Sequence, residues 1–88
     1  MITKEYMILA PEGMHARPAT AMVKLARKYQ SVILLKAGGK EARLNSLLNI
    51  LSMHIKGGSP VALVFEGIDE GEAAAAFDLF FAQNLKDW

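Results

Sequence analysis

A proline near the start of an amphipathic segment determines where the first helix of this chain can begin. Pro18 has no backbone N–H and holds φ near the helical value, so it suits the first turn of a helix and disrupts the interior. Helical spacing then gathers one apolar stripe: Ala19, Met22, Val23, Ala26 and Tyr29. The opposite stripe is basic: Arg17, Lys24 and Lys28. The sequence therefore predicts a helix over residues 16–28 with one buried and one solvated side.

The same boundary places His15 at the mouth of this helix. The first N–H groups of a helix lack partners within it, and its N-terminal end is partly positive, so this end attracts phosphate. A neutral histidine there is able to attack a phosphoryl group, and an arginine two residues on, Arg17, has a guanidinium suited to phosphate oxygens. The competing interpretation is a histidine that only completes a helix end, beside an ordinary solvated arginine.

Short strand-like and helical segments alternate along the rest of the chain. Gly38-Gly39 suits a tight hairpin turn, because both positions accept positive φ. The predicted strands cover residues 2–8, 32–37, 40–44 and 60–66. The predicted helices cover residues 16–28, 47–53 and 70–84, the last with Ala74, Phe77, Phe81 and Leu85 on its inner face. The order βαββαβα predicts a two-layer α/β sandwich with the helices on one face.

Length and composition narrow the possible classes of protein further. Eighty-eight residues allow a single domain, over residues 1–88. The absence of cysteine excludes disulfides and thiolate metal sites, and two histidines make another metal site improbable. Residues 1–5 have no signal-peptide pattern, and no apolar run is long enough to span a bilayer. We therefore expect a cytoplasmic protein without membrane insertion.

The net charge of +1 conceals an asymmetry along the chain. Residues 1–56 hold nine of the ten Lys and Arg residues and three of the nine acidic ones, for a charge of +6, while residues 57–88 carry −5. The basic part includes the histidine motif and would attract an acidic protein partner or a phosphate. A total near zero argues against a dedicated nucleic-acid binder.

The segment His15-Ala16-Arg17-Pro18-Ala19-Thr20, at this distance from the start of a chain of this length, closely resembles the active-site motif of HPr. HPr proteins are the histidine phosphocarriers of the bacterial phosphoenolpyruvate-dependent sugar phosphotransferase system. The resemblance implies an α+β, open-faced two-layer sandwich, with a four-stranded antiparallel sheet and three helices on one face. It also implies a carrier rather than an enzyme, without a cofactor, that is phosphorylated on Nδ1 of His15 by Enzyme I and passes the group to IIA components of sugar permeases.

A second motif, Arg43-Leu44-Asn45-Ser46-Leu47-Leu48, resembles the regulatory serine segment of HPr proteins that are substrates of HPr kinase/phosphorylase. A phosphoserine at a helix N-terminus is favoured by the helix dipole, and its charge would weaken docking of acidic partners. The simpler interpretation, that Asn45 or Ser46 caps the following helix, holds in either case.

The short helix over residues 47–53 is apolar on two sides. Ile50 and Met53 form one side, and Leu47, Leu48 and Leu51 the other. A short surface helix buries only one of them unless loops cover both, so we expect an exposed apolar patch. The resemblance implies that Enzyme I, IIA proteins and a transcriptional regulator dock there, and we expect a basic rim from Arg17, Lys24 and Arg27. The expected partner-binding residues are Thr20, Lys24, Arg27, Leu47, Leu48 and Leu51.

Asn49 and His54 depart from the family pattern, because glycine is usual at both positions; either the short helix is better formed or its exit loop differs. Met7, Val32, Leu34 and Val64 alternate onto the predicted open sheet face, which suggests a monomer or a weak dimer.

Two other functions remain open. One is a regulatory or nitrogen-branch relative that signals by its phosphorylation state. The other is a binding module without phosphoryl transfer, which would need the motif to be accidental.

Overall fold

A computed structural model of the chain describes residues 1–8 and 11–83. The elements follow the predicted order and comprise β1 (Ile2–Met7), α1 (Ala16–Ala26), β2 (Val32–Ala37), β3 (Lys40–Arg43), α2 (Leu47–Leu51), β4 (Pro60–Glu66) and α3 (Glu70–Gln83). The end of the last predicted helix, at residue 84, and its inner-face residue Leu85 lie outside the described residues.

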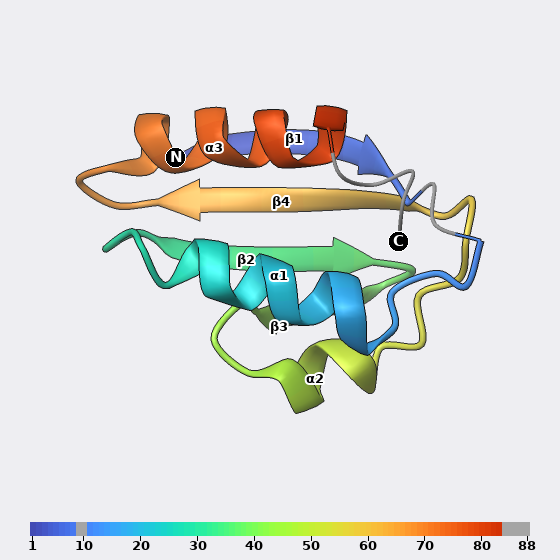
Figure 1. The fold of residues 1–88 in the computed structure, drawn as a ribbon. Coiled ribbons are helices and arrows are strands. Elements are labelled where there is room, and N and C mark those ends of the chain that lie inside the picture. The colour runs from blue at the N-terminus through green and yellow to red at the C-terminus, as the bar shows by residue number, and fades with distance from the viewer. Residues whose placement is uncertain (9–10, 84–88) are drawn as a thin grey trace.

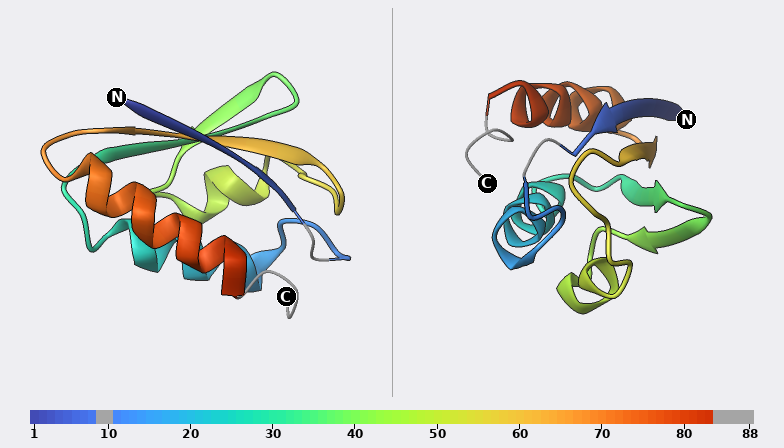
Figure 2. Two further views of the ribbon diagram at one scale, coloured as in Figure 1. Left: turned by 90° about the horizontal axis from the view of Figure 1, so that it is seen from above. Right: turned by 90° about the vertical axis from the view of Figure 1, so that its right-hand side faces the viewer.

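The four strands form one antiparallel sheet in the order β1-β4-β2-β3. Only β2 and β3 pair as a local hairpin, across the predicted Gly38-Gly39 turn. The strand β4 lies between β1 and β2, so two of the three pairings join distant parts of the chain. All three helices lie on the same face of this sheet (Figures 1 and 2). The predicted α+β, open-faced two-layer sandwich is confirmed.

The core lies between the sheet and the helices. Period-two alternation turns Ile33 and Leu35 of β2 inward, beside Leu63 and Phe65 of the central strand. The predicted apolar stripe of α1 packs against them, and its basic stripe is exposed. From α3 the core receives the following side chains: Ala73, Ala74, Phe77, Phe80 and Phe81.

Two helices end earlier than predicted. The helix α1 ends at Ala26 rather than at residue 28, because the N–H groups of Lys28 and Tyr29 bond carbonyls three residues back. The helix α2 ends at Leu51 in the same way, with the N–H of His54 bonded to its carbonyl. Tightened final turns of this kind satisfy carbonyls that a helix end leaves without partners.

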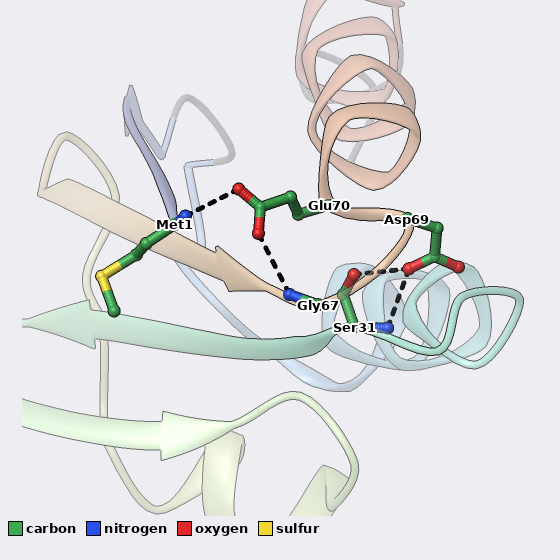
Figure 3. A network of polar contacts seen from close by, with 5 residues as sticks. All are labelled: Met1, Ser31, Gly67, Asp69 and Glu70. Carbon is green, nitrogen blue, oxygen red and sulfur yellow. Dashed lines mark hydrogen bonds and ion pairs between the residues drawn. The ribbon is translucent and has the colours of Figure 1, made fainter.

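Carboxylates fix the start of α3 to neighbouring segments (Figure 3). Asp69 accepts from the hydroxyl of Ser31, from the N–H of Ser31 at 2.9 Å and from the N–H of Gln30 at 2.8 Å. These bonds, the one from the Ser31 hydroxyl above all, hold the pKa of Asp69 below its usual value. Glu70 accepts from the N–H of Gly67 at 3.2 Å and pairs with the amino group of Met1 at 2.7 Å.

The edge strand β1 is attached to α3 through Tyr6. Its ring stacks on Phe81 with centroids 4.0 Å apart and planes 2° from parallel. Its hydroxyl donates to the carboxylate of Asp78, which also pairs with Lys4 at 3.3 Å. Burial, followed by the hydrogen bond to the Asp78 carboxylate, raises the pKa of Tyr6. The same hydrogen bond lowers the pKa of Asp78.

The open sheet face is apolar only in part. Met7 and Val32 are exposed, whereas Leu34 is half-buried and Val64 is only 9% exposed. Leu34 and Val64 lie opposite each other in the β2–β4 pairing, so they cover one another. The exposed apolar area on this face is therefore smaller than the alternation of the sequence indicates. Within the described residues, no helix is both long and apolar enough to cross a membrane.

Candidate functional site

His15 is the N-cap of α1, as the position of Pro18 predicts. Its backbone is extended, with φ −95° and ψ −174°, and its carbonyl accepts the first helical hydrogen bond from the N–H of Ala19 at 3.1 Å. Its side chain makes no capping hydrogen bond, although an N-cap side chain often does. The imidazole is 29% exposed, so the N-cap position presents the ring at the surface instead of using it to close the helix.

The segment before His15 is anchored to the chain that follows α2. The N–H of Met14 donates to the carbonyl of Ile55 at 2.8 Å, and the Met14 side chain is buried. Gly13 has φ +72°, and a β-carbon on it would lie 2.2 Å from the same carbonyl oxygen. Only glycine allows this approach. The position of His15 therefore depends on a contact between segments forty residues apart, which no local pattern encodes.

His15 lines a shallow surface depression with a volume of about 650 Å³. Leu51, from the end of α2, belongs to the same wall, and Figure 1 shows the start of α1 and the end of α2 on the same side of the molecule. The predicted acceptor thus lies beside one member of the predicted docking patch. Three charged or titratable residues outside the sequence motifs also line the depression: Glu12, His54 and Lys56.

Glu12 makes a direct contact with the predicted acceptor. Its Oε2 lies 3.7 Å from Nε2 of His15, and its side chain is 78% exposed. The sequence could have indicated this contact, because Glu12 and His15 are only three positions apart and Gly13 between them allows a sharp turn.

His54 adopts a left-handed backbone, with φ +52°. Among the described residues it is the only non-glycine with positive φ. A β-carbon is disfavoured in that conformation, which agrees with the glycine that the resemblance implies at this position. The side chain is exposed at the exit of α2 and borders the depression that holds His15.

Ser46 is the N-cap of α2, which settles which of Asn45 and Ser46 caps this helix. Its hydroxyl accepts from the N–H of Asn49 at 3.4 Å, a long bond. Ser46 is half-buried, so its side chain is partly accessible from solvent.

The apolar patch on α2 is narrower than predicted. Ile50 and Met53 are buried, as expected for one side of the helix. On the other side only Leu48 projects fully, with 77% exposure, while Leu47 and Leu51 are half-buried against the core. Arg17 and Lys24 on α1 and Arg27 at its C-cap are exposed, and Thr20 is half-buried. The helices α1 and α2 contact each other, so these basic residues and the exposed Leu48 belong to neighbouring helices.

The arrangement suits an exchange of anionic groups at the surface. A half-exposed imidazole stands at the start of a helix, with Arg17 in its first turn and Lys56 on the wall beside it. In residues 1–8 and 11–83, no three His, Cys, Asp or Glu side chains are grouped so as to hold a metal ion.

Comparisons with known proteins agree with this geometry. The sequence model of the PTS HPr component phosphorylation site family matches residues 2–83. An HPr from Thermoanaerobacter tengcongensis is 31% identical, with a TM-score of 0.91 and coverage of 100% of this chain and 99% of that one. The histidine-containing phosphocarrier protein of a mycoplasma is 30% identical, with a TM-score of 0.89 and coverage of 99% and 100%. Crh, a catabolite-repression protein of Bacillus subtilis that forms a swapped dimer, is 26% identical, with a TM-score of 0.73 and coverage of 97% and 98%.

Proposed function

The chain belongs to the HPr family, and we propose that it accepts a phosphoryl group on His15 from phospho-Enzyme I and passes it to IIA components of sugar permeases. A phosphocarrier role in the phosphotransferase system, rather than catalysis, is the role of this family. The observation that carries the proposal is the half-exposed imidazole at the start of α1, which is not used to cap its own helix.

In the proposed transfer the Nδ1 lone pair of His15 forms a bond to phosphorus while the donor's bond to phosphorus breaks. The group keeps its negative charges, and the guanidinium of Arg17 and the amide groups at the start of α1 offset them. In the return step a nucleophile on the acceptor protein takes the group and leaves the imidazole neutral. No cofactor takes part at His15 itself.

The proposed docking surface comprises the exposed Leu48 of α2 and three exposed basic residues of the neighbouring segment: Arg17, Lys24 and Arg27. An apolar centre with a charged rim is the usual composition of a transient interface. The positive rim favours acidic partner surfaces and raises the rate of encounter. The chain would act as a single domain over residues 1–88, in the cytoplasm.

We propose Ser46 as a second phosphorylation site, for an HPr kinase/phosphorylase. Its half-buried hydroxyl at the start of α2 lies on the helix that carries Leu48, so a phosphate there would place negative charge on the docking surface. A transcriptional regulator is a further candidate partner of this surface.

A regulatory role without sugar transport is the second candidate function, and the likeness to Crh favours it. Weak self-association through the open sheet face is a separate proposal, with Met7 and Val32 as its exposed apolar groups. Light scattering over a concentration series tests the self-association, and a constant monomer mass would exclude it.

The decisive test uses the only two histidines of the chain. The protein is incubated with phosphoenolpyruvate, magnesium and Enzyme I, and its intact mass is measured at neutral pH and after mild acid. We expect an added phosphoryl group that acid removes, in the wild type and in the control His54→Ala but not in His15→Ala. Phosphorylation of His15→Ala, or none in the wild type with its cognate Enzyme I, would contradict the proposal.

A further inference from the structure

Glu12 contacts the imidazole of His15 at Nε2. Its Oε2 is 3.7 Å from Nε2, the nitrogen that is not phosphorylated in the proposed transfer. A carboxylate favours a proton on the ring nitrogen that it faces, and a neutral imidazole carries one proton. A proton on Nε2 leaves the lone pair on Nδ1. The contact therefore favours the tautomer that the proposed reaction needs.

We propose that Glu12 is a positioning residue for phosphoryl transfer, which holds the proton of His15 on Nε2 and stabilises the positive ring that forms when Nδ1 binds phosphorus. This inference rests on the proposed function. Before the transfer the ring is neutral, with its proton on Nε2. As Nδ1 forms the bond to phosphorus and the donor's bond breaks, the ring gains a positive charge while Nε2 keeps its proton. The charge disappears again when the group leaves for the acceptor.

The Glu12 carboxylate speeds both the gain and the loss of the phosphoryl group by His15, for the same electrostatic reason. The transition states for gain and loss of the group both have a partly positive ring, and Glu12 stabilises that charge in each. A carboxylate behind the histidine of a hydrolytic triad acts in this way, by fixing the tautomer and stabilising the imidazolium. Here the carboxylate comes from the turn that precedes the histidine, three residues earlier in the chain.

The exposure of Glu12 sets the size of the effect. At 78% exposure the interaction is screened by water, so we expect a rate change of about two- to fivefold rather than orders of magnitude. Among the residues that the structure describes, His54 and Lys56 are the other ionisable groups on the wall of the depression, and Arg17 lies in the first turn of α1. When charged, all three are cationic and disfavour a positive ring, so the proposed contribution of Glu12 opposes theirs.

The test compares Glu12→Gln with the wild type and with the control Glu66→Gln, which removes an exposed acid from the far end of β4. The substitution keeps the shape of the side chain and removes its charge. Transfer from phospho-Enzyme I is measured over a range of carrier concentrations, so that the turnover rate and KM separate. We expect the turnover rate of Glu12→Gln to fall about two- to fivefold, whereas a change in KM alone would report an effect on docking.

A second measurement needs no partner protein. The purified phosphorylated forms are left to lose the group spontaneously at neutral pH, and the rate is recorded. Loss is faster when Nε2 carries a proton, because a neutral imidazole then leaves. Without the Glu12 charge this proton is held less firmly, so we expect the group to be lost about two- to fivefold more slowly.

The outcomes separate the two proposals. If the wild type takes up a phosphoryl group and Glu12→Gln matches it in turnover rate and in the rate of spontaneous loss, the role of Glu12 is wrong and the carrier function stands. If the wild type takes up no group, both proposals fail together. A lower turnover rate and a slower spontaneous loss in Glu12→Gln, with Glu66→Gln unchanged, would support the inference.

Discussion

The carbonyl oxygen of Ile55 lies so close to Gly13 that a β-carbon on this residue would collide with it. It would be 2.2 Å from that β-carbon and accepts the N–H of the next residue, Met14, at 2.8 Å. Two segments from opposite halves of the chain therefore meet backbone to backbone directly before His15. The geometry of the candidate site depends on the absence of one side chain.

Gly13→Ala should destabilise the protein by about 2 kcal/mol or more, because its methyl group meets a fixed backbone oxygen and its φ is positive. Gly38→Ala is the matched control, with φ +56° and nothing within 4 Å of the added carbon, and should cost only about 1 kcal/mol. Urea unfolding measures both. Equal losses would show that the contact with Ile55 contributes nothing.

His54→Gly should stabilise the protein by about 0.5–1 kcal/mol, because glycine adopts the left-handed conformation at φ +52° without a β-carbon penalty. His54→Ala removes the imidazole but keeps the β-carbon, so its stability should stay close to that of the wild type. Thermal unfolding of the three proteins separates the backbone effect from that of the side chain. If His54→Gly and His54→Ala gain equal stability, the backbone conformation is not the cause of the gain.

Asp69 should make stability depend on pH in acid. Hydrogen bonds from Ser31 and Gln30 hold its folded pKa below the unfolded value, so their contribution is present above the unfolded pKa and is lost as pH falls through the folded pKa. Asp69→Asn should therefore be less stable than the wild type at pH 7, and the gap should narrow below about pH 4. Urea unfolding over a series of acid pH values measures the difference in stability, and a difference that stays constant would contradict this origin.

Ser46 gives a test that separates capping from charge. Ser46→Ala should lose about 0.5–1 kcal/mol of stability with the cap, whereas Ser46→Asn and Ser46→Asp keep an N-cap acceptor. Only Ser46→Asp adds a negative charge to the docking surface, so it alone should slow phosphoryl uptake from Enzyme I. Equal uptake by the Asn and Asp variants would contradict a regulatory role for charge at this position.

Local sequence signals predicted the elements and the position of His15 well, because they rest on short-range chemistry. Pro18 fixed the helix start, Gly38-Gly39 the hairpin, and helical spacing the buried stripe of α1. Periodicity did not give the strand order, since β4 pairs with strands far away in the chain.

Surroundings built from distant segments could not be predicted either. The contact of Gly13 with Ile55 and the depression shared by His15 and His54 exist only once the sheet has formed. Leu47 and Leu51 appeared as exposed as Leu48 because helical spacing alone does not say how far a short helix sinks into the core.

The central position of β4 has a consequence for biosynthesis. This strand is the sixth of seven elements, yet both β1 and β2 hydrogen-bond to it. A nascent chain that has emerged from the ribosome only as far as α2 contains the hairpin β2–β3 and has no strand to join it to β1. Most of the sheet, and with it the backbone contact between Met14 and Ile55, must therefore form late in translation. Until then β1 has no strand to pair with.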